Sequence, residues 1–231
     1  MTVPFLRELG RGLTDALLPQ RCPGCGVPAE AATLLCDSCA ARVPRLRAAL
    51  CARCLVEGRE PSGCARHRAF SVFAPWLFDE RAAAVVHALK YQDRPGLSAS
   101  LGGEMAAALP ARWRRPDLVL EVPLHAARLR ERGYNQSAAL ADALADALGA
   151  PRLEGALSRI RATAPQAQLG PARRRANLAG AFAIERPGRL RGRRVLLVDD
   201  VITTGATLDA ALTALHDAGA LAAGATLAWA Q

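Results

Sequence analysis

The sequence predicts an α/β fold, in which helices flank a mainly parallel sheet, with a small cysteine-rich module ahead of the sheet. The apolar residues 195–198 are followed by two aspartates, a short loop and an apolar-periodic segment over 208–218. This is the pattern of a buried parallel strand that leads into a helix. Residues 118–122 form a second short and mostly apolar segment, which is also followed by a helical segment. All seven cysteines lie before both runs.

The length and composition of the chain limit the function classes. A chain of 231 residues has room for one medium-sized domain and a small appendage. It contains no uninterrupted apolar run of about 18 residues, so no transmembrane helix is expected. Its first residues lack the apolar core of a secretory signal. We therefore expect a cytoplasmic protein whose cysteines stay reduced and serve as metal ligands rather than disulfides.

Positive charge is concentrated in one part of the chain. The formal net charge is +9, and residues 128–194 alone hold fourteen arginines against five acidic residues. Such a stretch favours polyanionic partners such as pyrophosphate, nucleic acid or anionic lipid. A solvated basic face without a partner is the simpler alternative.

Residues 1–19 are predicted to form an amphipathic N-terminal helix. Apolar side chains recur at steps of three and four residues, and Pro19 ends the run. The apolar positions are Phe5, Leu6, Leu9, Leu13, Leu17 and Leu18. We expect this face to pack against its own protein, and weak peripheral contact with a membrane is the alternative.

Residues 20–68 carry two sets of metal-ligand side chains with the spacing of a double zinc ribbon. The first set consists of Cys22, Cys25, Cys36 and Cys39, and the second of Cys51, Cys54, Cys64 and His67. Each set can complete a tetrahedron around a structural Zn²⁺, and four protein ligands leave no open position for a catalytic water. One or two zinc ions are therefore expected. The second set could instead be a degenerate ribbon, and the spacing does not settle whether the two ribbons exchange ligand pairs.

Residues 69–231 are predicted to form the α/β domain. Strands are expected over 70–78, 118–122, 195–198 and 222–230, and helices over 81–90, 97–109, 137–148 and 208–218. Pro75 indicates that the first strand lies at an edge or contains a bulge. Pro110 ends the second helix.

The loop after residues 195–198 has the composition of a sugar-phosphate site. Asp199 and Asp200 lie where the strand is expected to end, and ligands of open α/β sheets bind at the carboxyl ends of strands. The loop and helix start that follow can bind a phosphate through hydroxyl groups and amides. The residues concerned are Thr203, Thr204, Gly205, Ala206 and Thr207. The aspartates can accept hydrogen bonds from sugar hydroxyls, directly or through Mg²⁺. The alternative is an ordinary strand whose carboxylates cap the next helix.

A second anion site is predicted after residues 118–122. Arg128, Arg130 and Arg132 lie in the loop after this strand, and guanidinium groups bind phosphate oxygens through paired hydrogen bonds. If both strands belong to one sheet, the two loops lie side by side, and one would bind a 5′-phosphate and the other a pyrophosphate. A charged helix start is the alternative.

Residues 157–182 are predicted to form a mobile loop over the site. Short apolar stretches, two prolines and clustered Arg and Gln side chains favour this interpretation. The candidates for contact with nucleic acid in this loop are Arg159, Arg161, Arg173, Arg174 and Arg175. Because few aromatic side chains accompany them, contact with backbone phosphates is favoured over base stacking.

Residues 195–207 closely resemble the phosphoribosyl pyrophosphate (PRPP) loop of type I phosphoribosyltransferases. An Arg-Gly-Tyr-Asn-Gln block at 132–136 and an Arg-x-x-Asn-Leu-x-Gly-Ala-Phe block at 174–182 accompany it. With the CxxC-rich ribbon, these blocks make residues 20–231 similar to the ComF family, which joins a double zinc ribbon to a type I phosphoribosyltransferase domain.

The resemblance implies a type I phosphoribosyltransferase fold over 69–231 and a PRPP site, with Mg²⁺, that is formed by the two aspartates and the loop after them. It also implies a middle motif that consists of Arg132, Gly133, Asn135 and Gln136. His67 stands where the family usually has a cysteine, which affects only the second zinc site.

ComF proteins are linked to DNA uptake in naturally competent bacteria, so the resemblance implies a PRPP-binding protein that acts in DNA uptake or utilisation. Its expected partners are PRPP, single-stranded DNA and competence or DNA-uptake proteins. The alternative is an active phosphoribosyltransferase that acts on an unidentified base-like acceptor, without a DNA role. A scaffold that contacts other proteins through its ribbons is a third interpretation.

Overall fold

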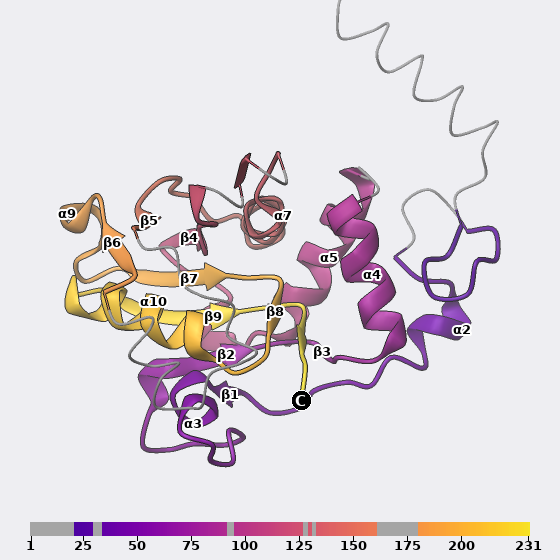
Figure 1. Cartoon of the computed structure of the whole chain (residues 1–231), viewed down its shortest axis with the longest axis horizontal. Helices are drawn as coiled ribbons and strands as arrows, with labels where there is room; N and C mark the ends of the chain where they lie inside the picture. The colour runs from indigo at the N-terminus through magenta and orange to yellow at the C-terminus, as the bar shows by residue number, and fades with distance from the viewer. Residues whose placement is uncertain (1–20, 30–33, 92–94, 127–128, 131–132, 161–179) are drawn as a thin grey trace, which may run out of the picture.

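A five-stranded sheet forms the centre of the molecule (Figure 1). The computed structural model describes residues 21–29, 34–91, 95–126, 129–130, 133–160 and 180–231, so the helix predicted over 1–19 lies outside the described residues. The strands follow the order β1 (Leu50–Cys51), β2 (Ser71–Phe73), β9 (Leu221–Ala225), β7 (Arg194–Val198) and β4 (Leu118–Glu121). The β1–β2 pair is antiparallel and the other neighbours are parallel, which confirms the predicted mainly parallel sheet.

Helices cover both faces of this sheet, so its central strands are apolar along their length. The helices on one face are α4 (Glu80–Tyr91), α5 (Pro95–Ala108) and α7 (Gln136–Leu148). The helices on the other face are α3 (Ala52–Val56) and α10 (Ala206–Asp217). Leu196 and Val198 of β7 pack on the three-helix side, and Val195 and Leu197 pack on the α10 side. Successive side chains along a strand point to opposite faces of the sheet, so neighbouring residues of β7 pack against different helices.

Each of the four predicted helices is present, with ends that differ by one or two residues. In α7, the side chain of Asn135 accepts a hydrogen bond from the N–H of Ser137, and Gly149 ends the helix in the left-handed conformation. The helices α5 and α7 pack closely because Gly102 has no side chain. A Cβ atom at Gly102 would lie 2.3 Å from the carbonyl oxygen of Ala143.

Two predicted strands are each divided between two sheets, which corrects the sequence-based expectation. The segments 70–78 and 222–230 form β2 and β3 (Trp76–Leu77), and β9 and β10 (Ala228–Trp229), respectively. β3, β10 and β8 (Val201–Ile202) make a separate parallel sheet. Pro75 has no N–H for a strand ladder and lies where the chain leaves β2. The segments that follow β2 and β9 leave the main sheet side by side, since the N–H of Thr226 still donates to the carbonyl oxygen of Phe73 at 2.9 Å.

An antiparallel pair of strands, which the sequence did not predict, lies at the two ends of the loop expected over 157–182. The strands are β5 (Leu157–Arg159) and β6 (Phe182–Ile184). Residues 161–179 lie outside the described residues, so the prediction of a loop over the site stays a prediction. Further short helices in the described part of the chain include α2 (Asp37–Ala40), η1 (Arg68–Phe70), η2 (Ala111–Trp113) and α9 (Pro187–Leu190).

The cysteine-rich segment is joined directly to the sheet. Leu50 and Cys51 of β1 pair with Val72 and Ser71 of β2, and α3 follows β1 without a break. Within the residue ranges given above, none of the helices has the length and apolar character that crossing a bilayer requires.

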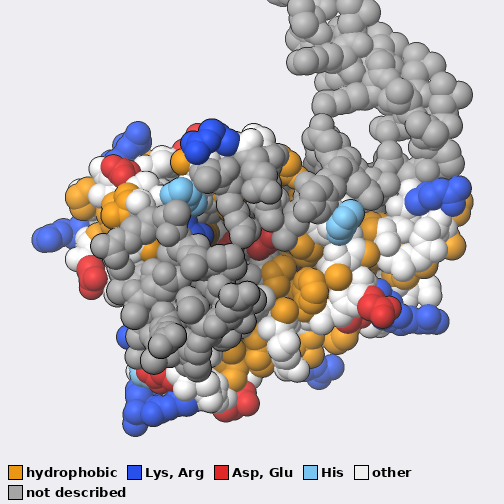
Figure 2. Space-filling view, viewed as in Figure 1, with side chains coloured by type: hydrophobic (Ala, Val, Ile, Leu, Met, Phe, Trp, Pro, Cys, Tyr) orange, Lys and Arg blue, Asp and Glu red, His pale blue; other side chains and the backbone are white. Residues whose placement is uncertain are grey.

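Some of the positive charge of residues 128–194 is neutralised by ion pairs within the fold. Arg152 pairs with Glu121 at 3.2 Å and also with Asp142, while Arg194 lies 3.7 Å from Asp117. On the face shown in Figure 2, the described Lys and Arg side chains stand apart from one another near the edge, and hydrophobic side chains gather towards the middle.

Candidate functional site

The carboxyl ends of β4 and β7 lie side by side, as predicted for two strands of one sheet. Glu121 pairs with Val198 in the parallel register, and the N–H of Val122 donates to the carbonyl oxygen of Val198 at 2.8 Å. The loops after both strands therefore begin at the same edge of the sheet. Arg128 and Arg132 of the loop after β4 lie outside the described residues.

The loop after β7 leads through β8 into the N-terminus of α10. Gly205 precedes the helix and adopts the left-handed conformation with a φ of 75°. The N–H of Asp209 donates to the carbonyl oxygen of Gly205 at 2.8 Å and closes the first turn. The amides of Ala206 and Thr207 lie in this first turn, where N–H groups have no acceptor inside the helix and the helix dipole is positive.

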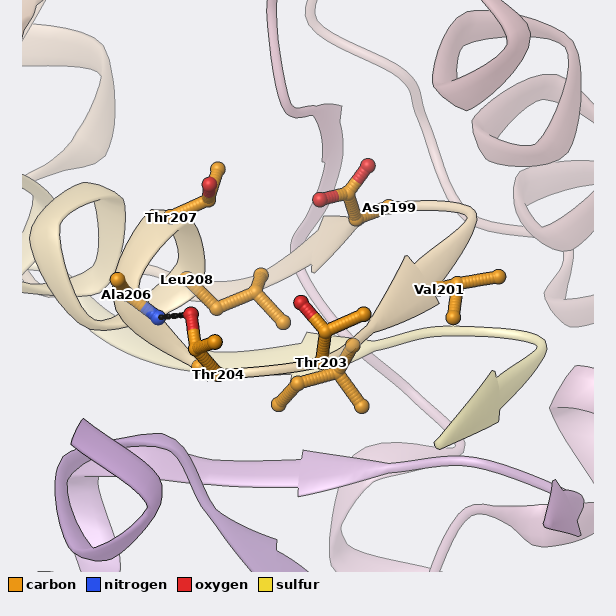
Figure 3. A pocket seen from close by; sticks show the side chains of 9 residues that line it. Asp199, Val201, Thr203, Thr204, Ala206, Thr207 and Leu208 are labelled. Carbon is orange, nitrogen blue, oxygen red and sulfur yellow. Dashed lines mark hydrogen bonds between the residues drawn. The ribbon is translucent and has the colours of Figure 1, made fainter. Parts of the chain in front are cut away.

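These residues line a small open hollow of about 40 Å³ (Figure 3). One water needs roughly 10–15 Å³, so the hollow suits a group of phosphate size rather than a whole nucleotide. The lining residues are Asp199, Val201, Ile202, Thr203, Thr204, Gly205, Ala206, Thr207 and Leu208. All five predicted loop residues and Asp199 are thus brought together, whereas Asp200 does not line the hollow. The hydroxyl oxygen of Thr204 lies 3.5 Å from the N–H nitrogen of Ala206, which donates to it (Figure 3).

Hydrogen bonds orient both carboxylates of the acidic pair. Asp199 Oδ1 accepts from the hydroxyl of Ser137 at 2.8 Å and from the N–H of Asp200 at 2.9 Å. Asp200 Oδ1 accepts from the N–H of Val201 at 2.7 Å. Ser137 is buried, and it connects the acidic pair to the first turn of α7. From the sequence alone, Ser137 is predicted only as the start of a helix. Its position directly after the 132–136 block is the feature that could have indicated a role at the site.

The block at 132–136 joins three elements around the site. The hydroxyl of Tyr134 donates to the carbonyl oxygen of Leu89 in α4 at 2.6 Å. The side-chain N–H of Asn135 donates to the carbonyl oxygen of Val122 at 3.1 Å, and its oxygen accepts from the N–H of Ser137 at 3.2 Å. This block therefore positions the start of α7 against the ends of β4 and α4.

The eight predicted metal-ligand side chains form two clusters, and each cluster uses the residues of its own set. Within each cluster, the ligand atoms all lie within 4.8 Å of one another. A tetrahedral site with Zn–S bonds of about 2.3 Å places its sulfur atoms roughly 3.8 Å apart. The Sγ atoms of Cys25 and Cys36 lie 3.6 Å apart, so the first cluster fits zinc without any exchange of ligand pairs between the ribbons.

His67 completes the second cluster through Nδ1. This atom lies 3.6 Å from Cys54 Sγ and 3.9 Å from Cys64 Sγ, and the two sulfur atoms lie 3.4 Å apart. Backbone N–H groups of Cys54 and His67 point at Cys51 Sγ and Cys64 Sγ, both at 3.4 Å. Such donors stabilise thiolates that bind a metal. The donor set and its spacing therefore fit a Cys₃His zinc site.

The pKa values of the thiols diverge within the clusters. Burial raises the pKa of Cys22, but N–H donors led by Cys36 outweigh it and lower the pKa to about 6. Burial, followed by neighbouring thiols, raises the pKa of Cys39 to about 12, and the same causes raise the pKa of Cys54 to about 12. A bound divalent cation compensates several thiolate charges at once, so both clusters have the chemistry of structural zinc sites.

Arg159 is the candidate nucleic-acid residue that falls within the described part of the loop over 157–182. It lies on β5, and its guanidinium stands 5.8 Å from the centre of the Phe182 ring. The other four candidates, Arg161, Arg173, Arg174 and Arg175, lie outside the described residues.

Comparison with known proteins identifies both parts of the chain. The family model of the phosphoribosyl transferase domain matches residues 134–231, and that of the double zinc ribbon domain matches residues 13–66. Both parts agree with the sequence-based interpretation.

Three curated proteins are similar to this chain. DNA utilization protein YhgH of Salmonella typhimurium is 34% identical over 187 residues, which cover 75% of this chain and 80% of that protein. The protein of the same name from Escherichia coli O157:H7 is 34% identical over 192 residues, covering 81% and 74%. Competence protein F of Haemophilus influenzae is 41% identical over 95 residues, covering 41% and 42%. A solved structure of the allosteric regulatory enzyme of purine biosynthesis aligns with a TM-score of 0.39 at 25% identity, covering 61% of this chain and 30% of that chain.

Proposed function

This chain belongs to the ComF family, and on that premise we propose that it is a PRPP-binding protein that acts in DNA uptake or utilisation. The observation that carries the proposal is the loop after β7, where an acidic pair, a hydroxyl-rich turn and the open N-terminus of α10 lie together at one edge of the sheet. Relatives named DNA utilization protein and competence protein support its DNA-related part.

The N-terminus of α10 would bind a phosphate of PRPP. The amides of Ala206 and Thr207 supply N–H donors, and the helix dipole favours a negative charge there. The hydroxyls of Thr203 and Thr207 add donors beside the same hollow. Asp199 and Asp200 would accept hydrogen bonds from the ribose hydroxyls. Mg²⁺ bound with PRPP would offset the charge of the pyrophosphate.

The loop after β4 would supply the cationic part of the site. It begins beside the acidic pair because β4 and β7 are neighbours in the sheet. We propose that Arg128 and Arg132 in this loop contact the phosphate group that α10 does not bind, through paired hydrogen bonds from their guanidinium groups.

Each cysteine cluster would bind one structural Zn²⁺. Four protein ligands complete a tetrahedron, so neither ion would have an open position for substrate or water. All seven cysteines of the chain belong to these clusters. Because thiolate ligands require a reducing compartment, this assignment supports a cytoplasmic location.

The basic stretch 128–194 would bind single-stranded DNA through backbone phosphates. Each phosphate neutralised on a single strand adds about 0.7 to the slope of log affinity against log salt concentration. Replacing Arg173, Arg174 and Arg175 by Gln should therefore lower this slope by up to about 2. Arg112→Gln, an exposed arginine outside the stretch, serves as the control. An affinity that does not respond to salt contradicts the DNA-binding part of the proposal.

Transfer of the phosphoribosyl group to a base-like acceptor is the second candidate function, and the acidic pair at the end of β7 favours it. A nitrogen of the acceptor would form a bond to C1 of the ribose while the bond from C1 to the pyrophosphate oxygen breaks. The carboxylates would stabilise the positive charge that develops at C1, so no nucleophile from the protein is needed.

A ³¹P NMR experiment with PRPP, Mg²⁺ and the purified protein separates the two functions. Broadened PRPP signals without free pyrophosphate indicate binding alone. Free pyrophosphate that forms only in the presence of one base indicates transfer to that base. Unchanged PRPP signals in all samples contradict both.

Asp200→Asn tests the acidic pair with the same experiment. A carboxylate that accepts hydrogen bonds from sugar hydroxyls contributes about 1.5–3 kcal/mol, so we expect PRPP affinity to fall at least roughly tenfold. Asp217→Asn makes the same charge change at the exposed far end of α10 and should leave the affinity unchanged. Equal losses in both variants would show that only net charge matters.

A further inference from the structure

The backbone of the second cysteine cluster touches the phosphate loop. Cys51 caps the N-terminus of α3 and Cys54 lies within this helix, and α3 lies against the N-terminus of α10. A Cβ atom at Gly205 would lie 2.6 Å from the carbonyl oxygen of Ala52 and 2.9 Å from the Cβ of Leu55. The helix that begins at one metal ligand and contains another therefore approaches the start of α10 so closely that no side chain fits between them.

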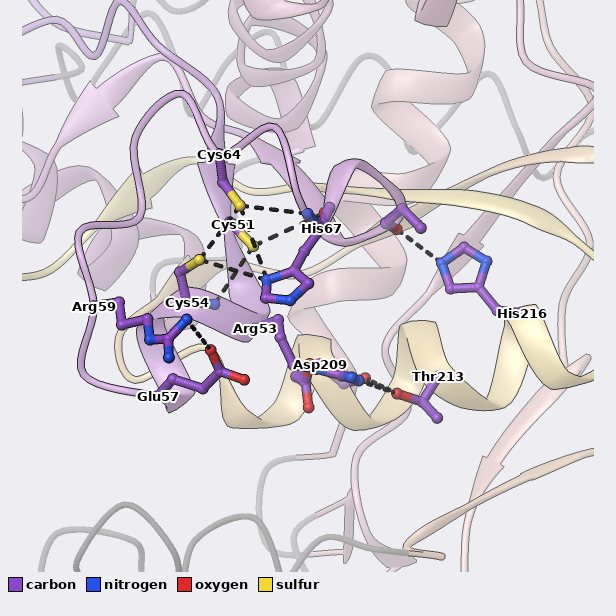
Figure 4. A network of polar contacts seen from close by, with 11 residues as sticks. Cys51, Arg53, Cys54, Glu57, Arg59, Cys64, His67, Asp209, Thr213 and His216 are labelled. Carbon is purple, nitrogen blue, oxygen red and sulfur yellow. Dashed lines mark hydrogen bonds and ion pairs between the residues drawn. The ribbon is translucent and has the colours of Figure 1, made fainter.

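Arg53 extends this contact along α10 (Figure 4). Its Nε donates to the carboxylate of Asp209 at 2.5 Å, and a terminal N–H donates to the hydroxyl of Thr213 at 3.0 Å. Its guanidinium also stacks 3.9 Å over the centre of the Phe70 ring. Asp209 is 6% exposed and lies in the first turn of α10, next in sequence to Leu208 of the hollow, so Arg53 compensates a buried negative charge in that turn.

The last ligand of the second cluster, His67, leads into a segment that also contacts α10. The segment η1 follows His67 directly and contains Ala69 and Phe70. His216 Nε2 lies 2.7 Å from the carbonyl oxygen of Ala69, and the His216 and Phe70 rings meet edge to face with their centres 5.4 Å apart. Both ends of the second cluster thus contact α10, one near the first turn and one near the last.

We propose that metal binding at the second cluster holds the PRPP loop in its binding conformation, with Arg53 as the positioning residue that joins the two sites. The proposal rests on PRPP binding as proposed above. The proposal gives the Cys₃His cluster a regulatory role. Loss of the zinc ion from this cluster would weaken PRPP binding, although none of the zinc ligands belongs to the PRPP site.

Two physical effects connect the sites. A helix of five residues is too short to persist in isolation, so an ion that joins Cys51 at the N-cap to Cys54 inside the helix would help to hold α3 in place. When α3 is no longer held, the contact with Gly205 and the position of Arg53 are lost together. Asp209 then keeps a buried, uncompensated charge about one helical turn from the phosphate, which opposes anion binding.

Thermodynamic linkage makes the coupling between zinc binding and PRPP binding reciprocal. If zinc at the second cluster raises PRPP affinity by some factor, PRPP raises zinc affinity at that cluster by the same factor. The first cluster packs with α4 and α5 on the opposite face of the sheet, and we expect its ion to be insensitive to PRPP.

Hydrogen exchange and PRPP titration on matched variants test the proposal. Arg53→Met and Cys64→Ser should speed exchange of the amides of residues 209–213 at least tenfold and weaken binding of Mg²⁺–PRPP at least tenfold. Arg59→Met is the matched control for Arg53, because Arg59 pairs with Glu57 at 3.7 Å inside the cysteine-rich segment. Cys25→Ser is the matched control for Cys64, because Cys25 belongs to the first cluster. Both controls should stay within about twofold of the parent protein.

Wild-type exchange and wild-type PRPP affinity in folded Arg53→Met overturn the proposal. Equal effects of Cys25→Ser and Cys64→Ser overturn it too. If Arg53→Met does not fold, zinc release from the unmodified protein to a chelator decides: saturating PRPP should slow release of one of the two ions at least tenfold, and unchanged release of both overturns the proposal. If the unmodified protein does not bind PRPP, the proposed function fails, and the exchange rates of residues 209–213 alone decide whether the second cluster controls α10.

Discussion

At the scale of single residues, Gly205 meets two independent requirements. Its φ of 75° lies in the left-handed region, and the backbone of Ala52 occupies the space where a side chain would begin. The first requirement comes from the turn into α10, and the second comes from the packing of α3. A residue other than glycine would violate both.

We therefore expect Gly205→Ala to lower the free energy of unfolding by about 2–4 kcal/mol, from left-handed strain of roughly 1–2 kcal/mol and from overpacking. Urea denaturation measures this loss. Gly149→Ala is the control, because Gly149 has a φ of 59° and no atom within 4 Å of its Cβ position. That variant should lose only about 1 kcal/mol. Equal losses at both positions would show that α3 yields to the added methyl group.

Arg152 shows that an arginine of the basic stretch can be structural. Its side chain is largely buried and contacts Glu121 at the end of β4, Asp142 on α7 and Glu154. Glu121 Oε2 lies 3.2 Å from Arg152 without a well-aligned hydrogen bond, so the contact is an ion pair. Removing the guanidinium leaves the Glu121 carboxylate buried beside the strand end that leads into the site.

Arg152→Met should therefore lower the free energy of unfolding by about 1–3 kcal/mol, because breaking a buried ion pair leaves one charge uncompensated. Thermal or urea denaturation checks the loss. Arg189→Met, at an exposed position of α9, should change stability by less than about 0.5 kcal/mol. A stability loss in Arg152→Met no larger than in this control would contradict the structural role.

At the scale of helices and strands, adjacent glycines in α5 have opposite environments. A Cβ atom at Gly102 would overlap the backbone of α7 at Ala143, whereas a Cβ atom at Gly103 has no neighbour within 4 Å. The same chemical change should thus have opposite signs at two neighbouring positions. Helix propensity alone would favour alanine at both.

Gly102→Ala should lower the free energy of unfolding by about 1–3 kcal/mol, because α5 and α7 must move apart. Gly103→Ala should raise it by up to about 1 kcal/mol, because the exposed glycine only adds entropy to the unfolded chain. Urea denaturation of both variants gives the comparison. Stabilisation of Gly102→Ala would mean that α5 and α7 do not pack as closely as described.

At the scale of the whole molecule, the two cysteine clusters are attached to opposite faces of one sheet. Cys22 and Cys39 of the first cluster belong to the core that contains α4, α5 and α7. The α3 residues beside the second cluster, Ala52 and Val56, belong to the core that contains α10. Zinc at the two positions would therefore stabilise both halves of the core.

Zinc affinity should fall as the pH is lowered. The pKa of about 12 at Cys39 and at Cys54 means that both thiols are protonated near neutral pH without metal, and zinc binding must release those protons. For each proton released, affinity falls about tenfold per pH unit. Competition with a chelator between pH 8 and 6 measures the slope. As a control, Zn²⁺ added to the metal-free protein should restore its melting temperature, whereas Mg²⁺ should not. A flat profile contradicts thiolate ligation.

Several parts of this protein are predictable from local patterns of residue types. The strand at 195–198, the helices of the α/β domain and the two sets of metal ligands follow from hydrophobic period and from spacing. The acidic pair and hydroxyl-rich loop were also recognisable, because every residue involved lies within a few positions along the chain.

Contacts between segments that are distant in the sequence become visible only in the folded molecule. The fold divides each of two expected strands between two sheets, assigns each ligand set to its own cluster, and brings Ser137 to Asp199 across 62 positions of sequence. It also pairs Arg53 with Asp209 across 156 positions. Such contacts arise from how helices and strands pack, and a local pattern of residue types does not indicate which distant side chain will lie opposite.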